Sequence, residues 1–158
     1  MAHKYAATEI VELGVQIERN GLQFYTILAE NAANSDVAEI FRFLGEEEEK
    51  HIGIFQKILG TVQSYEPQAS YPEEYFSYLH EIASEHVFTQ VDKGAEVART
   101  ITGDVQAIDV ALKFEDDSIR FFDAMKKIVP SDQNSLIDQL IEQEKKHVEK
   151  LQLLKSIS

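Results

Sequence analysis

Apolar residues recur every three or four positions along four long stretches of the chain, and this spacing predicts four α-helices. The first predicted helix covers about Thr8–Asn34. The second covers about Asp36–Leu59, with Asp36 as its N-cap and Gly60 as its stop. At 1.5 Å of rise per residue, helices of this kind are roughly 35–40 Å long and can pack side by side.

The second half of the chain repeats this arrangement. A third helix is predicted to begin near Asp104, just after Gly103, and to end at Pro130. A fourth follows a cap at Ser131 or Asp132 and continues almost to the C-terminus.

The three connections differ in length. Tight turns join helix one to helix two and helix three to helix four, whereas the segment Thr61–Thr102 separates helices two and three. Helix-start residues at Ser70–Glu73 and a further short helix around Phe88–Arg99 are expected within it. The predicted fold class is therefore all-α, a ferritin-like antiparallel four-helix bundle with a long, partly helical crossover between helices two and three.

The apolar stripe of every predicted helix is interrupted at its middle by a glutamate, and two stripes carry a histidine one turn later. Glutamate is almost never fully buried unless it is paired or binds a metal. Four carboxylates at one height would repel one another, whereas two divalent cations would cancel their charges and neutral imidazoles would complete the ligand set. The stripe residues that form this candidate metal site are Glu18, Glu48, His51, Glu115, Glu144 and His147.

The candidate ligands occur in two similar halves. The segment Glu18–Tyr25 aligns with Glu115–Phe122, and Glu48–Ile52 aligns with Glu144–Val148. Each Glu-x-x-His places both side chains on one helix face, and a single such motif is common by chance. Two of them in register with partner glutamates predict one pseudo-twofold site for two metals.

Each residue also has a simpler interpretation. Charge runs usually mark a solvated face, so in the run Glu46–Glu49 we expect only Glu48 to be buried. Tyr25 could be a packed ring whose hydroxyl finds any partner, and we interpret Ser118 as a small filler.

Composition narrows the class of protein further. The length suits one domain, residues 1–158, and the absence of Cys excludes a thiolate metal site. The formal charge of −13 argues against nucleic acid as a partner. No apolar run approaches a membrane span, and the first residues show no signal-peptide pattern, so we expect no membrane partner and a cytoplasmic location.

With these motifs, the sequence resembles the rubrerythrin-type di-iron domain of the ferritin-like superfamily over nearly its whole length, without a rubredoxin module. The resemblance implies that Glu48 and Glu144 bridge the metals, whereas the first glutamate of each half is a terminal ligand and each histidine binds one metal. It also implies that Tyr25 hydrogen-bonds a ligand carboxylate. Two positions depart from the family pattern, because Ser118 stands where rubrerythrins carry an additional Glu, and Phe122 is the second-half counterpart of Tyr25.

The resemblance implies two Fe ions as cofactors, although Mn or Zn also suits oxygen and nitrogen donors. The expected function is a di-iron oxidoreductase of the peroxidase or ferroxidase type. Its expected partners are peroxide or O2, an external electron donor such as a rubredoxin-like protein, and a second copy of the chain in a homodimer. Two alternatives stay open at this point: a non-catalytic iron-binding or storage protein, and a helical interaction protein with a structural metal site.

Overall fold

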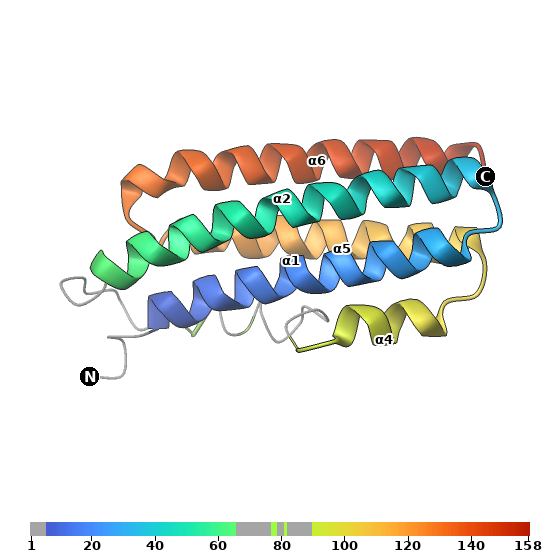
Figure 1. Cartoon of the computed structure of the whole chain (residues 1–158). Helices are drawn as coiled ribbons and strands as arrows, with labels where there is room; N and C mark the ends of the chain where they lie inside the picture. Colours follow the sequence, from blue (N-terminus) through green and yellow to red (C-terminus); the bar gives the residue numbers. More distant parts are fainter. Residues whose placement is uncertain (1–5, 66–76, 79–80, 82–89) are drawn as a thin grey trace.

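The computed structural model describes residues 6–65, 77–78, 81 and 90–158. Four long helices lie side by side, and a short helix lies on the outside of the first (Figure 1). The long helices are α1 (Ala6–Asn31), α2 (Ser35–Tyr65), α5 (Asp104–Met125) and α6 (Asn134–Ser156). The short elements are the helix α4 (Lys93–Thr100) and the 3₁₀ helix η4 (Ser131–Gln133).

The bundle consists of two helix pairs, α1 with α2 and α5 with α6, which meet along α1–α5 and α2–α6. Figure 1 shows α2 and α5 running in the same direction, so α2 ends and α5 begins at opposite ends of the bundle. This connectivity confirms the predicted all-α, ferritin-like four-helix fold. Among the described helices, none combines the length and the apolar character needed to cross a membrane. The single domain expected for residues 1–158 stays a prediction.

The crossover is described only in part. The helix start predicted at Ser70–Glu73 lies outside the described residues. The short helix predicted around Phe88–Arg99 is present as α4, which begins at Lys93. Its buried face consists of small residues, and this allows α4 to lie close against α1.

Hydrogen bonds of the Asn20 side chain hold α4 against α1. Its side chain is fully buried, donates a hydrogen bond to the carbonyl of Gln90 (2.6 Å) and accepts one from the backbone N–H of Gly94 (3.0 Å). A Cβ on residue 94 would lie 2.0 Å from the carbonyl oxygen of Asn20, so only glycine permits this approach.

The turn between α1 and α2 differs from the prediction. Helix α1 ends at Asn31 rather than Asn34, and the Asn34 side-chain oxygen accepts hydrogen bonds from the N–H groups of Asp36 (2.7 Å) and Val37 (3.3 Å). Asn34 therefore caps α2, and the prediction of Asp36 as the N-cap is wrong.

The predicted stop at Gly60 is also wrong, because α2 continues to Tyr65. Val62 extends the buried stripe of Phe55 and Ile58 and is 1% exposed. Burial of one such side chain is worth about 1.5–3 kcal/mol, which exceeds the ~1 kcal/mol cost of a glycine inside a helix.

Helix α5 begins at Asp104 as predicted but ends at Met125, before Pro130. Its last turn tightens, because the N–H of Ile128 donates to the carbonyl of Met125 at a separation of three residues. The chain then enters η4 through Pro130. Ser131 lies within η4, so the predicted cap of helix four is wrong and α6 begins three residues later, at Asn134.

Asp104 holds the two halves of the bundle in register. Its carboxylate accepts hydrogen bonds from the backbone N–H groups of Ala33 (3.0 Å) and Asn34 (3.1 Å). The start of α5 is thereby tied to the α1–α2 turn.

Candidate metal centre

The six candidate ligands converge at mid-height in the centre of the bundle. Helices α1 and α5 each contribute one glutamate, whereas α2 and α6 each contribute a glutamate and a histidine. All six side chains are fully or almost fully buried; they are Glu18, Glu48, His51, Glu115, Glu144 and His147. The structure therefore brings together every residue that the sequence placed in the candidate site.

Donor atoms of these residues form two overlapping groups, in each of which the atoms lie within 4.8 Å of one another. One group contains Glu18 and His51 and the other contains Glu115 and His147, while Glu48 and Glu144 belong to both. Two such groups fit a binuclear metal site.

Both histidines direct Nδ1 into the cluster. Nδ1 of His51 lies 2.8 Å from Glu144 Oε1 and 3.4 Å from Glu18 Oε2. Nδ1 of His147 lies 3.6 Å from Glu115 Oε1 and 3.8 Å from Glu144 Oε2. The two imidazole rings are stacked, with centroids 5.9 Å apart and an interplanar angle of 15°. This geometry repeats the pseudo-twofold relation seen in the sequence.

The protonation of the metal-free cluster reflects its burial. Loss of hydration raises the pKa of Glu18, Glu48 and Glu115 well above the ordinary value, and the negative charge of neighbouring glutamates adds to this effect. Burial acts in the same direction on Glu144, but contacts with Glu115 and the two histidines outweigh it and lower the pKa of Glu144.

The histidines take up protons beside these carboxylates. Burial alone would lower the pKa of His51, yet its contacts with Glu144 raise that pKa to about 9. Contacts with Glu115 and Glu144 raise the pKa of His147 to about 10, again against the effect of burial. Protons therefore occupy the cluster in the absence of metal, and metal binding has to displace them.

Several carboxylate oxygens and imidazole nitrogens of the cluster have no hydrogen-bond partner, and two bound cations would take that place. Buried polar atoms in proteins almost always have a hydrogen-bond partner. Within the described part of the chain, the buried side-chain oxygen and nitrogen atoms that lack one all belong to these six residues, apart from Asn134 Oδ1. Carboxylate oxygens and imidazole nitrogens are suitable ligands for Fe, Mn or Zn. The residues present therefore fit two metal ions.

Tyr25 contacts the cluster directly. Its hydroxyl is fully buried and donates a 2.6 Å hydrogen bond to Glu115 Oε1. The contact is the one implied for this tyrosine by the family resemblance, and it orients the carboxylate of Glu115 while leaving its Oε2 without a partner.

Aromatic side chains close the site above and below. Phe55 and Phe122 pack with ring centroids 4.9 Å apart, and Tyr25 packs against Phe41 (6.0 Å) and Phe114 (5.9 Å). All five rings are essentially inaccessible to solvent. They keep bulk water away from the carboxylates, which strengthens electrostatic interactions within the cluster.

Gly21 provides the space for this packing. A Cβ at this position would lie 2.7 Å from Cζ of Phe114 and 3.1 Å from Oε2 of Glu48. The small residue on the stripe of α1 therefore lets a ring and a carboxylate of other helices approach the helix backbone.

Ser118 and Phe122, the two positions at which the sequence departs from the family pattern, are both buried. The hydroxyl of Ser118 donates to the carbonyl of Phe114 (2.8 Å), which agrees with its interpretation as a small filler. Phe122 belongs to the aromatic packing and carries no hydroxyl to match that of Tyr25.

Sequence reasoning missed two residues that contact the outer nitrogens of the histidines. Nε2 of His51 lies 2.6 Å from Oε1 of Gln143, and Nε2 of His147 lies 3.8 Å from Oε1 of Glu47. Glu48 is the one buried residue of the run Glu46–Glu49, as predicted, but Glu47 is only partly solvated, with 19% of its side chain exposed. The internal repeat held the missing signal, because Glu47 and Gln143 each precede a Glu-x-x-His.

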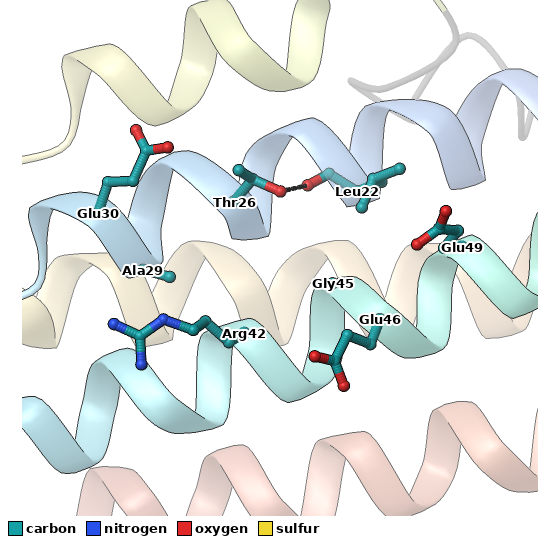
Figure 2. Close-up of a pocket in the computed structure, with 8 residues that line it drawn as sticks. All are labelled: Leu22, Thr26, Ala29, Glu30, Arg42, Gly45, Glu46 and Glu49. Carbon is teal, nitrogen blue, oxygen red and sulfur yellow. Dashed lines mark hydrogen bonds between the residues drawn. The ribbon is translucent and has the colours of Figure 1, made fainter.

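A surface groove of about 610 Å³ reaches the site between α2 and α6. His147, Phe43, Glu47 and Lys150 are among the residues that line it. A different groove, of about 350 Å³, lies between α1 and α2 (Figure 2). Its lining includes Glu46 and Glu49 but none of the six clustered residues. Of these two grooves, the one between α2 and α6 is the one lined by a residue of the cluster.

Fold and site together define a four-helix bundle with a buried Glu/His centre for two metals. The chain belongs to the rubrerythrin family, because the family model described as Rubrerythrin matches residues 9–155. It carries no Cys and hence no rubredoxin module. Comparison with curated proteins and with solved structures gave no significant match.

Proposed function

We propose that this protein is a di-iron oxidoreductase of the peroxidase or ferroxidase type, which reduces peroxide or O2 with electrons from an external donor. The observation that supports the proposal most directly is the pair of overlapping Glu/His groups whose buried donor atoms have no other partner. Membership of the rubrerythrin family supports iron rather than manganese or zinc.

In this proposal the residues have different roles. Glu48 and Glu144, which belong to both groups, would hold both metals, while Glu18 and Glu115 would each hold one. His51 and its counterpart His147 each supply Nδ1, the ring nitrogen that faces the cluster. When bound, two ferrous ions supply two electrons, which together with two protons convert one hydrogen peroxide into two waters.

The surrounding residues prepare the site for this chemistry. Tyr25 keeps the carboxylate of Glu115 in one orientation through its hydrogen bond. The aromatic layers exclude bulk water, and the groove lined by His147 offers a small oxidant a route to the site. Binding and orientation are thus the tasks of the chain itself.

Electrons have to come from another molecule in this proposal. The chain has no Cys with which to build an iron–sulfur or rubredoxin-type centre of its own. A rubredoxin-like protein is the proposed donor. The homodimer expected from the sequence stays a prediction.

The experiment has two stages. The first measures iron content by plasma mass spectrometry for the wild type, for a Glu48→Ala, His51→Ala variant, and for Glu49→Ala as a control. Glu49 is exposed, so its loss removes a charge from α2 without touching the cluster. We expect two irons per chain in the wild type and in the control, and loss of iron in the double variant.

The second stage mixes the ferrous protein with peroxide or O2 in a stopped-flow instrument, with free Fe(II) for comparison. Oxidation no faster than that of free Fe(II) by either oxidant would refute the proposal. Rapid oxidation without re-reduction by any added donor would instead favour an iron-binding or storage protein. Normal metal content with no redox response would favour a structural metal.

A further inference from the structure

The two histidines of the centre are related by the internal repeat, but their outer nitrogens meet chemically different partners. Gln143 on α6 stands next to Nε2 of His51, and Glu47 on α2 stands next to Nε2 of His147. Each partner comes from the opposite half of the bundle and directly precedes a bridging-position glutamate. The pseudo-symmetry is therefore broken at this pair, where one half has an amide and the other a carboxylate.

We propose that Glu47 and Gln143 are positioning residues that make the two metal positions unequal, so that the position of His147 binds a divalent cation more tightly than that of His51. The inference rests on the dinuclear site of the proposed function and not on its redox chemistry.

Gln143 already lies within hydrogen-bond distance of His51 in the structure. The amide oxygen lies 2.6 Å from Nε2 of His51 and can only accept, so the proton of the neutral ring resides on Nε2. Nδ1, which faces Glu144 at 2.8 Å, then has its lone pair free for a metal. Gln143 thus selects the binding tautomer and orients the ring, and it adds no charge.

Glu47 stands in the equivalent place with a full negative charge. Its Oε1 lies 3.8 Å from Nε2 of His147, and its Oε2 forms an ion pair of 3.2 Å with the exposed Lys50. Nε2 of His147 has no hydrogen-bond partner. A side-chain movement of about 1 Å brings the carboxylate into hydrogen-bond range.

Phe43 packs against the imidazole of His147 beside this contact. The edge of its ring packs on His147 with centroids 6.2 Å apart, and Nζ of Lys150 lies 5.0 Å from the centroid of Phe43. His147 is only 2% exposed although it is one of the residues that line the groove. A carboxylate beside a shielded imidazole acts more strongly than it would in open solvent.

A carboxylate partner makes imidazole a better metal ligand, and it also places a negative charge near the cation. An amide partner gives only the orientation. Replacement of such partners typically changes metal affinity about 10–100-fold. The two binding steps should differ by a factor of this order.

The test is a titration of the metal-free protein with Zn(II) in competition with a chromophoric chelator, which resolves the two stepwise affinities without redox chemistry. The variants are Glu47→Gln, Gln143→Glu and the double exchange. The matched control is Glu46→Gln, because Glu46 carries the same charge on the same helix but lines the groove on the α1 side (Figure 2).

We expect two separated steps in the wild type. Glu47→Gln should weaken the tighter step about tenfold or more and bring the steps together, Gln143→Glu should strengthen the weaker step, and the double exchange should separate them again. Cadmium-113 NMR should show two resonances, of which Glu47→Gln shifts one.

Three outcomes would overturn the inference: equal steps in the wild type, no change in Glu47→Gln, or an equal change in Glu46→Gln. Each of these leaves the dinuclear site intact. Absence of any tight Zn(II) binding in the wild type would instead overturn both this inference and the proposed function.

Discussion

Removal of the metals should reverse the pH dependence of this protein's stability. In the metal-free protein, burial tends to lower the pKa of His51, but contacts with the ionised Glu144 raise it from 6.5 to about 9. A raised folded-state pKa stabilises the fold fully below pH 6.5, and the contribution is lost as the pH rises towards 9. This change is worth about 3 kcal/mol for His51, at about 1.36 kcal/mol for each pH unit.

The buried carboxyl groups also change the free energy of unfolding between pH 6.5 and 9. Burial raises the pKa of Glu18, Glu48 and Glu115, so each favours the fold below its ordinary value of 4.5 and costs stability as the pH rises above it. Glu144 has a lowered pKa, and its contribution is lost only as the pH falls below 4.5. The metal-free protein should therefore become less stable between pH 6.5 and 9.

The metal-loaded protein should respond in the opposite direction. Protons compete with the cations for the same oxygen and nitrogen atoms, so metal binding strengthens as the pH rises. Because the metals bind the folded chain, stronger binding raises the free energy of unfolding.

The assay is thermal unfolding followed by far-UV circular dichroism between pH 6.5 and 9, once with a chelator and once after loading with Zn(II). A loss of 3 kcal/mol corresponds to a fall in Tm of about 6–12 °C for a chain of this size. His51→Gln should reduce the slope of the metal-free profile, of which His147 still contributes a part, whereas Glu49→Gln, at an exposed position on the same helix, should leave the slope unchanged. A metal-free Tm that stays constant or rises over this interval would refute the reasoning, as would an unchanged slope in His51→Gln.

Two further substitutions test the packing around the centre. Tyr25→Phe removes the 2.6 Å hydrogen bond to Glu115 and should weaken Zn(II) binding about 10–100-fold, as measured by chelator competition; a wild-type affinity would contradict the orienting role. Gly94→Ala places a Cβ 2.0 Å from the carbonyl oxygen of Asn20 and should cost about 1–3 kcal/mol in urea unfolding. Gly53→Ala, where an added Cβ would meet no side chain and no other helix within 4 Å, should instead stabilise the protein by about 0.5–1 kcal/mol, so equal effects of the two changes would be evidence against the close approach of α4.

The repeat of apolar positions was sufficient to predict four helices, their antiparallel pairing and the ferritin-like connectivity. Helices could be predicted because the periodicity of apolar residues is a local property of the chain. The connectivity could be predicted because two short connections and one long connection permit few arrangements of four helices. The six clustered residues were predictable for a related reason. A glutamate such as Glu48 on an apolar stripe is too costly to bury without a partner, so its position on the stripe itself signals a site.

Helix ends depended on contacts that a local pattern does not contain. A glycine such as Gly60 is typical of a helix end, but α2 continues beyond it because Val62 is buried in the core. Asn34 rather than Asp36 caps α2, and the backbone N–H of Asn34 is in turn bound by Asp104 from the other half of the bundle.

The sequence by itself determined the helices, the metal-binding character of the core and the internal repeat. Only the tertiary structure decided which residues face each other across the α2–α6 interface, and so placed Gln143 on His51 and Glu47 beside His147. The physical reason is that periodicity assigns a residue to a helix face, whereas its partner on another helix is set by the register and rotation of the packed helices.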